Sequence, residues 1–247
     1  MKKGPALSKR LTCLYDFCVL AGEEAPYILC DVGCDHAHVP IRLLGSGVIT
    51  RAICMDVIPG PLQKAKENLT LYGCEDGADL ILSDGLQQYP GGADVLLISG
   101  MGGILMAQIL LAEPEKVLSF RKIILQPQSE FTALRKALEQ LSIRIEDEAM
   151  VEEEGKFYPV LYASPFKENE SGAAALSDIE LEYGPVLLKK KDVVLKRYLE
   201  NGLLKIRRIL QGFPADGKDE ERASLLHTKE QIEQALFLVS EKEGSGQ

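Results

Sequence analysis

The fold of this chain is decided by the stretch YILCDVGCDH, residues 27–36. Its apolar run predicts a buried strand over Tyr27–Asp31, and Gly33 permits a tight turn into a following helix. In a doubly wound sheet such a turn lies at the carboxyl ends of the strands, where ligands bind. The turn Asp31–His36 is therefore the first candidate for a ligand site.

Apolar runs and helical patterns alternate on the C-terminal side of this turn. The expected parallel strands are Tyr27–Asp31, Arg51–Val57, Ala78–Leu82, Asp94–Ser99 and Arg121–Gln126. The expected helices are Ala37–Leu44, Pro61–Leu71, Gly103–Leu111 and Glu130–Leu141. Two further runs, Arg144–Glu152 and Lys156–Ser164, are close enough to pair as an antiparallel hairpin. The pattern predicts an α/β fold, a Rossmann-like sheet of parallel strands with a C-terminal antiparallel hairpin, over residues 1–166.

A second region, residues 167–247, differs in composition. A polar linker over 167–177 precedes helix-period segments at 178–212 and 219–243, separated by a Gly/Pro-rich turn, which predicts an α-helical hairpin. The chain carries a net charge of −9, which argues against nucleic-acid binding by its surface as a whole. Residues 186–211 are nonetheless strongly basic. Their basic side chains are Lys189, Lys190, Lys191, Lys196, Arg197, Lys205, Arg207 and Arg208. This segment either contacts phosphates or forms the solvated exterior of a coiled coil.

Composition excludes several classes of protein. No apolar run approaches the roughly 20 residues that span a bilayer, and no apolar segment follows the charged start, so we expect a cytoplasmic protein without a signal peptide. The six cysteines form no CxxC pair and are expected to be buried thiols, without a disulfide or zinc framework. Nothing marks a dimer interface, so a monomer is the default expectation.

Acidic residues recur at successive strand ends. The turn at Gly33 lacks the further glycines that a dinucleotide diphosphate requires. S-adenosylmethionine has no phosphate, and its ammonium and sulfonium groups suit an acid such as Asp31. Asp56 is placed for ribose hydroxyls, with Val57 beside it, and Asp84-Gly85 for the adenine amino group. Each acid alone could be a helix N-cap or a solvated loop residue. Together they favour a nucleoside pocket.

A glycine-rich segment, Ser99-Gly100-Met101-Gly102-Gly103, follows the fourth strand. Its glycines allow close approach of a ligand, and we assign Ser99, Gly100 and Met101 to the cofactor and Gly102 and Gly103 to the substrate. The alternative is a turn needed only for helix packing. The Asp/Asn-Pro-Pro-aromatic motif of enzymes that methylate exocyclic nitrogens is absent here, which argues against that chemistry.

Several motifs occur in order along the chain. They are Leu7-Ser8-Lys9-Arg10-Leu11, Asp31-Val32-Gly33-Cys34-Asp35-His36-Ala37, Gly60-Pro61, Ser83-Asp84-Gly85-Leu86, Ser99-Gly100-Met101-Gly102-Gly103, Leu125-Gln126-Pro127-Gln128 and Gly184-Pro185. Together they resemble the bacterial tRNA (adenine-22, N1)-methyltransferase family. The resemblance implies a Rossmann-like methyltransferase sheet, a coiled-coil-like extension, S-adenosyl-L-methionine as methyl donor and tRNA as substrate. Cys34, Asp56 and Gln128 depart from the residues common in that family.

The resemblance also extends the list of site residues. Arg10 would pack over the pocket and bind either the methionine carboxylate or a tRNA phosphate; a solvated surface arginine is the alternative. Gln126 and Gln128 would contact the substrate, as would Lys189, Lys190, Lys191 and Arg197 of the helical extension through RNA phosphates.

The expected reaction makes modest demands on the protein. Adenine N1 has an available lone pair, so alignment with the methyl group matters more than a strong base. Asp35 is the first candidate to accept a proton from the methylated base and His36 the second, while Asp35 could instead cap the following helix. A metal pair of His36 and His38 is disfavoured, because the chain offers no further ligands at suitable spacing. A methyltransferase for another RNA or a small molecule, and a non-catalytic S-adenosylmethionine-binding protein, are the alternatives.

Overall fold

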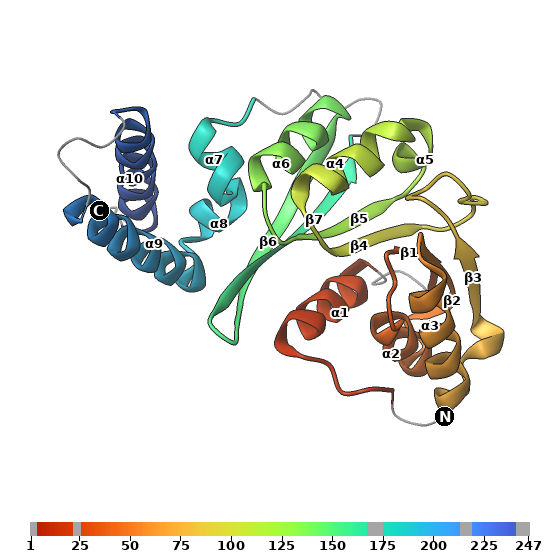
Figure 1. Ribbon diagram of the computed structural model, residues 1–247. Helices are drawn as coiled ribbons and strands as arrows, with labels where there is room; N and C mark the ends of the chain where they lie inside the picture. The colour runs from red at the N-terminus through yellow and green to blue at the C-terminus, as the bar shows by residue number, and fades with distance from the viewer. Residues whose placement is uncertain (1–3, 22–25, 167–174, 213–218, 241–247) are drawn as a thin grey trace, which may run out of the picture. The chain divides into compact units, whose positions relative to one another are not determined.

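The computed structural model describes residues 4–21, 26–166, 175–212 and 219–240 (Figure 1). The chain divides into two compact units, residues 1–175 and 176–247, and each is described by itself. The division falls within the linker expected over 167–177, most of which lies outside the described residues.

The first unit is built on a seven-stranded sheet of order β3-β2-β1-β4-β5-β7-β6. The strands are β1 (Tyr27–Val32), β2 (Ile49–Asp56), β3 (Ala78–Leu82), β4 (Val95–Met101), β5 (Lys122–Pro127), β6 (Ile143–Glu153) and β7 (Lys156–Pro165). Strands β1 to β5 run parallel, and β7 pairs antiparallel with both β5 and β6. The predicted Rossmann-like sheet with its C-terminal hairpin is confirmed.

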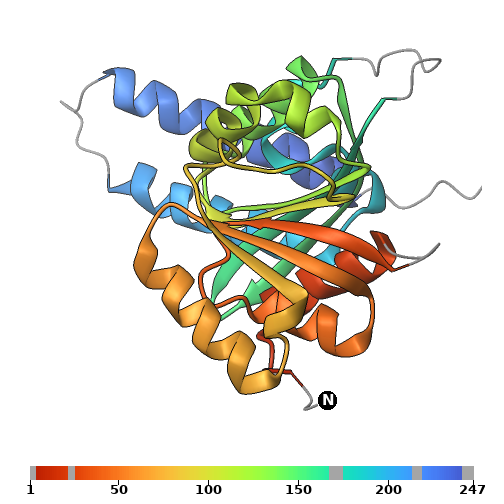
Figure 2. The same cartoon turned by 90° about the vertical axis from the view of Figure 1, so that its right-hand side faces the viewer.

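Helices cover both faces of this sheet (Figure 2). They are α1 (Lys9–Ala21), α2 (His38–Ser46), α3 (Pro59–Tyr72), the short 3-10 helix η1 (Glu75–Gly77), α4 (Gly103–Ala112), α5 (Pro114–Leu118) and α6 (Phe131–Gln140). Alternate side chains of β1 divide between two apolar cores: Leu29 belongs to the core beneath α1, α2 and α3, and Cys30 to the core beneath α4, α5 and α6. The alternation explains why a parallel strand covered on both faces is apolar throughout.

Helix α1 brings the N-terminal segment onto the C-terminal hairpin. Its buried side chains, Leu14, Phe17, Cys18 and Ala21, follow a helical period, and the Phe17 ring stacks on that of Tyr162 in β7 with centroids 5.7 Å apart. At the start of the helix the Lys9 backbone N–H donates to Glu153 Oε1 at 2.8 Å. The hairpin and the N-terminal helix therefore hold one another in place.

An ion pair ties the hairpin to helix α6. Arg135 Nη2 donates to Glu148 Oε1 at 2.8 Å, and the two side chains are 1% and 0% exposed. A charge so far from water is tolerable only when it is paired and hydrogen-bonded. This pair links β6 to the helix that packs beside it.

The described residues of the second unit form four helices. They are α7 (Asp178–Tyr183), α8 (Pro185–Lys190), α9 (Val193–Gln211) and α10 (Asp219–Ser240). The single helical segment expected over 178–212 is thus divided, because Gly184 and Lys191 adopt φ values of 95° and 53° and Asp192 caps α9 through the Val194 and Leu195 N–H groups. The expected Gly/Pro-rich turn lies mostly outside the described residues.

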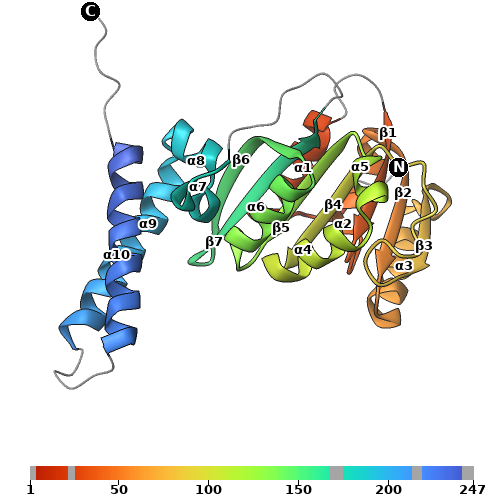
Figure 3. The same ribbon diagram turned by 90° about the horizontal axis from the view of Figure 1, so that it is seen from above.

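Helices α9 and α10 pack against each other (Figure 3). Gly202 of α9 allows close packing, since a Cβ there would lie 3.3 Å from Ile232 Cδ1 of α10. Arg207 and Glu233 form an ion pair across the two helices at 3.2 Å. The predicted helical pair is confirmed. Among the described residues, no helix is long and apolar enough to cross a bilayer. All six cysteine thiols are free, and five of them are buried.

Candidate functional site

Three acids lie at the carboxyl edge of neighbouring parallel strands. Asp31 is the penultimate residue of β1, Asp56 ends β2, and Asp84 follows β3 by two residues. In the sheet register, Asp31 aligns with Cys54 of β2, and Asp56 aligns with Leu82 of β3. The three carboxylates therefore emerge from one edge of the sheet, as their spacing in the sequence predicted.

Asp31 is the buried member of this group. Asp31 is only 4% exposed. Burial raises the pKa of its carboxyl group to about 7, with smaller contributions from the negative charges of Asp56 and Asp35. A carboxylate that is both desolvated and surrounded by like charge is stabilised by any cation that arrives beside it. Asp31 is thus suited to a positively charged ligand.

The turn after β1 is built on left-handed backbone conformations. Gly33, Asp35 and Ala37 have φ values of 75°, 45° and 55°, and the Gly33 N–H donates to Met55 O at 2.8 Å. A Cβ on Gly33 would lie 2.1 Å from the terminal methyl carbon of Met101. The backbone angle therefore favours glycine at position 33, and a Cβ there would displace the end of the Met101 side chain.

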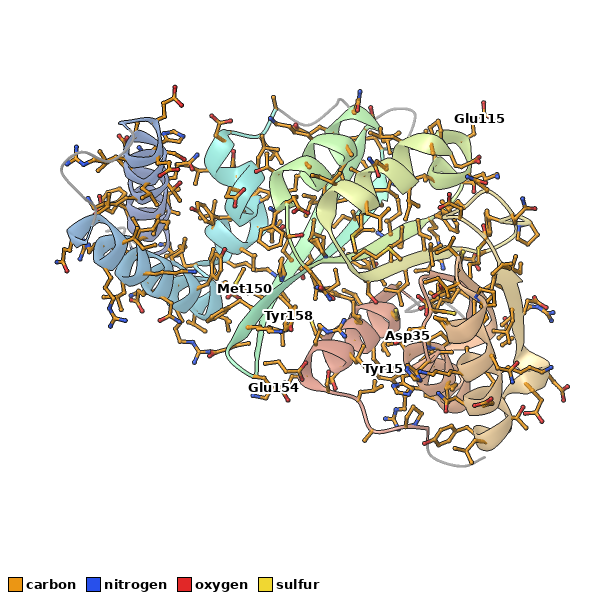
Figure 4. All side chains as sticks on the ribbon, viewed as in Figure 1. Tyr15, Asp35, Glu115, Met150, Glu154 and Tyr158 are labelled. Carbon is orange, nitrogen blue, oxygen red and sulfur yellow. The ribbon has the colours of Figure 1, made fainter. Side chains whose placement is uncertain are left out.

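Asp35 and His36 stand at the surface of this turn, where Figure 4 labels Asp35. Their side chains are 68% and 39% exposed, and His36 Nε2 lies 3.5 Å from Asp35 Oδ1. The N-cap of α2 is Ala37, and no side chain caps it. Helix capping, the alternative role for Asp35, does not occur. The ring of His38 lies 5.4 Å from that of His36, and burial and then the neighbouring His36 lower the His38 pKa.

The exits of β2 and β3 combine carboxylates with apolar surface. Asp56 Oδ1 accepts from the Ile58 N–H at 3.0 Å. The side chains of Val57 and Ile58 are 58% and 57% exposed, which is high for apolar residues beside a sheet edge. At the next exit Asp84 is exposed and Gly85 has a φ of 55°. Acids next to an apolar wall suit a nucleoside, whose ribose is polar and whose base is flat and apolar on its faces.

A second group of residues gathers over the end of β4. A Cβ on Gly100 would lie 3.7 Å from Gln128 Nε2 and 4.0 Å from Arg10 Nη1. Arg10 Nη1 donates to Gln126 Oε1 at 2.8 Å, and Gln126 Nε2 donates to Pro127 O at 2.8 Å. Gln126 is 0% exposed, and Arg10 is half-buried. Gln128 is exposed, and Ser99 and Met101 are half-buried.

Backbone packing accounts for Gly103, one of the two glycines assigned to the substrate. A Cβ on Gly103 would lie 2.3 Å from Glu130 O, and the Gly103 N–H donates to Ser129 O at 2.8 Å. A Cβ on Gly102 would lie 3.0 Å from Glu130 Oε2. The segment after β5 thus occupies the space that these glycines leave, which is the packing role left open in the sequence.

Sequence reasoning missed Tyr158. This tyrosine belongs to β7, and the Arg10 guanidinium carbon lies 5.6 Å from the centroid of its ring. The two residues are far apart in the chain, and no local pattern links them. Their contact depends on α1 packing against the hairpin.

The basic residues assigned to RNA belong to the second unit. Lys189 and Lys190 are exposed in the last turn of α8, Lys191 is half-buried at its C-cap, and Arg197 is exposed on α9. Cations near the C-terminus of a helix are favoured by its dipole. This gives the lysines a structural benefit beside any role in binding phosphate.

The sheet order, the terminal antiparallel hairpin and the nucleoside-type strand ends together define a Rossmann-like, class I S-adenosylmethionine-dependent methyltransferase. A family model described as tRNA (adenine(22)-N(1))-methyltransferase matches residues 29–236, and the chain belongs to that family. The resemblance inferred from the motifs is confirmed.

Known proteins agree with this membership. The chain is 31% identical to the tRNA (adenine(22)-N(1))-methyltransferase of Bacillus subtilis over 196 residues, covering 78% of this chain and 80% of that protein. It resembles a crystal structure of a putative tRNA (m1A22) methyltransferase of Streptococcus pneumoniae with a TM-score of 0.83 and 32% identity, covering 94% of this chain and 100% of the other. The same Streptococcus protein in complex with S-adenosyl-L-methionine gives a TM-score of 0.81 and 31% identity, with the same coverage of both chains.

Proposed function

We propose that this chain performs the reaction of its family, transfer of a methyl group from S-adenosylmethionine to N1 of adenine 22 in tRNA, at the carboxyl edge of β1, β2, β3 and β4. The observation that carries the proposal is the row of acids at three adjacent strand ends, with Asp31 buried among like charges at a turn that lacks a diphosphate-binding glycine pattern. Such a row repels phosphate and attracts a cationic nucleoside.

The residues present fit S-adenosylmethionine. Asp31 would hold its ammonium group, and Gly33 would let the ligand approach the backbone. Asp56 would accept from the ribose hydroxyls through the carboxylate oxygen that does not bind Ile58 N–H. Exposed Val57 would contact the adenine ring, and Asp84-Gly85 its amino group. When bound, S-adenosylmethionine supplies an electrophilic methyl group on a sulfonium.

The chain's own residues orient the acceptor. N1 lies on the Watson–Crick edge, so a paired adenine must leave its pair before it can react. Its lone pair needs alignment with the methyl group and no strong base. Methylation makes the base cationic, and the exposed carboxylate of Asp35 is placed to stabilise that charge or take a proton from the exocyclic nitrogen. His36, 3.5 Å away, would hold Asp35 in position.

The second unit would contact the tRNA backbone. We assign phosphate contacts to Lys189, Lys190, Lys191 and Arg197, because they form a basic segment in a chain of net charge −9. A lysine-to-glutamate triple variant at 189–191 is expected to weaken tRNA binding strongly and leave S-adenosylmethionine affinity unchanged. Each lost phosphate contact lowers the slope of log affinity against log salt by about one.

A matched triple variant separates contact from bulk charge. Lys64 and Lys66 of α3 and Lys136 of α6 are exposed, and their reversal changes the net charge by the same amount. Equal losses of tRNA affinity in the two triple variants would show that net charge, and not the α8 segment, controls binding.

Incubation with unmodified tRNA and methyl-labelled S-adenosylmethionine, followed by mapping of the modified base, tests the activity. We expect label on adenine 22. Label on another RNA position, or none from a preparation that binds S-adenosylmethionine, would favour a different acceptor or a non-catalytic binding protein.

A further inference from the structure

The carboxyl edge of the sheet has two chemically different halves. The acids stand at the ends of β3, β2 and β1, and this half fits the cationic nucleoside. On the other side of β1, the carboxyl ends of β4 and β5 and the start of the antiparallel strand β7 meet at the same edge. They carry Gly100, Gln126 and Tyr158, gathered around Arg10. The β4 end joins the halves, since the Met101 methyl group lies over Gly33.

Arg10 is held from two directions by uncharged groups. Gln126 is fully buried, and the bond from its Nε2 to Pro127 O fixes the amide so that Oε1 faces Arg10. The Tyr158 ring lies beneath the guanidinium at 5.6 Å, a distance at which the ring face attracts a cation. The Glu153 contact to the Lys9 N–H anchors the first turn of the helix that carries Arg10. Its side chain is therefore oriented before any ligand binds.

Neutral partners leave the charge of Arg10 available. Among the described residues no carboxylate forms an ion pair with it, and its one described hydrogen bond is the one to Gln126. A guanidinium has five N–H donors in a fixed fork that matches a planar or tetrahedral anion. Arg10 is held in place by an amide and a ring, and most of its N–H donors remain available to bind an anion.

We infer that Gln126 and Tyr158 are positioning residues that hold Arg10 for a phosphate of the tRNA backbone next to the target adenine. The inference rests on the proposed function, because it takes the acid half of the edge for the cofactor and leaves the half around Arg10 for the acceptor. Of the two anions left open for Arg10, the methionine carboxylate and a tRNA phosphate, it selects the phosphate. It also gives buried Gln126 a role that does not require contact with the base.

Variants of the two positioning residues test this inference. Tyr158→Leu removes the ring, and Gln126→Met removes the acceptor at similar volume. Each is expected to weaken tRNA binding about tenfold, the effect of losing one charge-assisted contact, and to lower the salt slope by about one. Tyr158→Phe keeps the ring face and is expected to restore wild-type tRNA binding. The affinity for S-adenosylmethionine, measured by calorimetry, is expected to stay within twofold in all three.

The measurements separate the outcomes. Thermal unfolding of each variant checks that the fold is intact, and Arg10→Lys supplies a second change that keeps the charge but loses the fork. A fall in S-adenosylmethionine affinity that matches the fall in tRNA affinity would overturn the inference and return Arg10 to the methionine carboxylate. Unchanged tRNA affinity in folded Tyr158→Leu would also overturn it. Both affinities are measured without turnover, so absence of methyl transfer by the wild-type chain would count against the proposed function alone.

Discussion

The protonation of Asp31 gives the sharpest prediction about cofactor binding. Its pKa is raised from 3.8 to about 7 by burial and by the charges of Asp56 and Asp35. A shift of about three units corresponds to about 4 kcal/mol, the order of the cost of ionising this group in the unliganded protein. A bound ammonium group offsets that cost, so S-adenosylmethionine binds the ionised form. Below pH 7 binding must then release a proton.

The direction of the pH dependence follows from linkage. The folded protein holds this proton more tightly than the unfolded chain does, so the unliganded protein loses stability as the pH rises from about 4 through about 7. Cofactor affinity changes in the opposite sense. It is expected to rise up to tenfold per pH unit between pH 5.5 and about 7 and then to level off.

Isothermal titration calorimetry in two buffers of different ionisation enthalpy measures both affinity and released protons. Asp31→Asn is expected to bind more weakly at pH 8, to lose the slope below pH 7, and to raise the unfolding temperature of the unliganded protein at pH 8. Asp84→Asn, at the exposed acid beyond β3, is expected to keep the slope. Wild-type affinity that is flat from pH 5.5 to 7.5, or a slope retained in Asp31→Asn, would refute the role given to Asp31.

Two further pairs of variants test the turn after β1 and the attachment of the hairpin. Gly33→Ala and Gly47→Ala place a Cβ at φ values of 75° and 74°, so each is expected to cost about 1 kcal/mol in urea unfolding. Only Gly33→Ala places a Cβ against the Met101 side chain, so only this variant is expected to lower S-adenosylmethionine affinity. Equal S-adenosylmethionine affinity in the two variants would show that the contact between Gly33 and Met101 is not part of the cofactor site. Glu148→Gln removes the carboxylate charge from a fully buried ion pair and is expected to cost about 3 kcal/mol or more. Asp79→Asn breaks an exposed pair and is expected to cost under about 1 kcal/mol, and similar losses in the two variants would contradict the importance of burial.

Local patterns were enough to predict the sheet. Each parallel strand contains a short apolar run, and β3 has the expected bounds, Ala78–Leu82. Helix α1 was not identified, although its buried positions 14, 17, 18 and 21 have the spacing of one helical face. Over 178–212, apolar periodicity continued across Gly184 and Lys191, where the backbone changes direction. Periodicity reports which face is buried and not whether the helix is continuous.

The site was only partly predictable for a related reason. Acids at strand ends are visible in sequence because parallel strands bring their carboxyl ends together. The surroundings of Arg10 were not visible, since Gln126 and Tyr158 reach it through tertiary packing. The sequence allowed two interpretations of the glycine-rich segment after β4, close approach of a ligand or close packing of a helix. At Gly103 the structure shows packing, because the backbone of Ser129 and Glu130 occupies the space where a Cβ would lie.

The proposed reaction places the methyl group on a single atom, N1 of adenine 22. Two tRNA transcripts are compared, one with adenine at position 22 and one with 1-deazaadenine there, which lacks the N1 lone pair but keeps the shape of the base. With labelled S-adenosylmethionine, we expect one methyl group per tRNA on N1 of adenine 22 in the first transcript and none in the second. Methylation of the 1-deazaadenine transcript, or none of the adenine transcript by protein that binds both S-adenosylmethionine and tRNA, would contradict the proposed function.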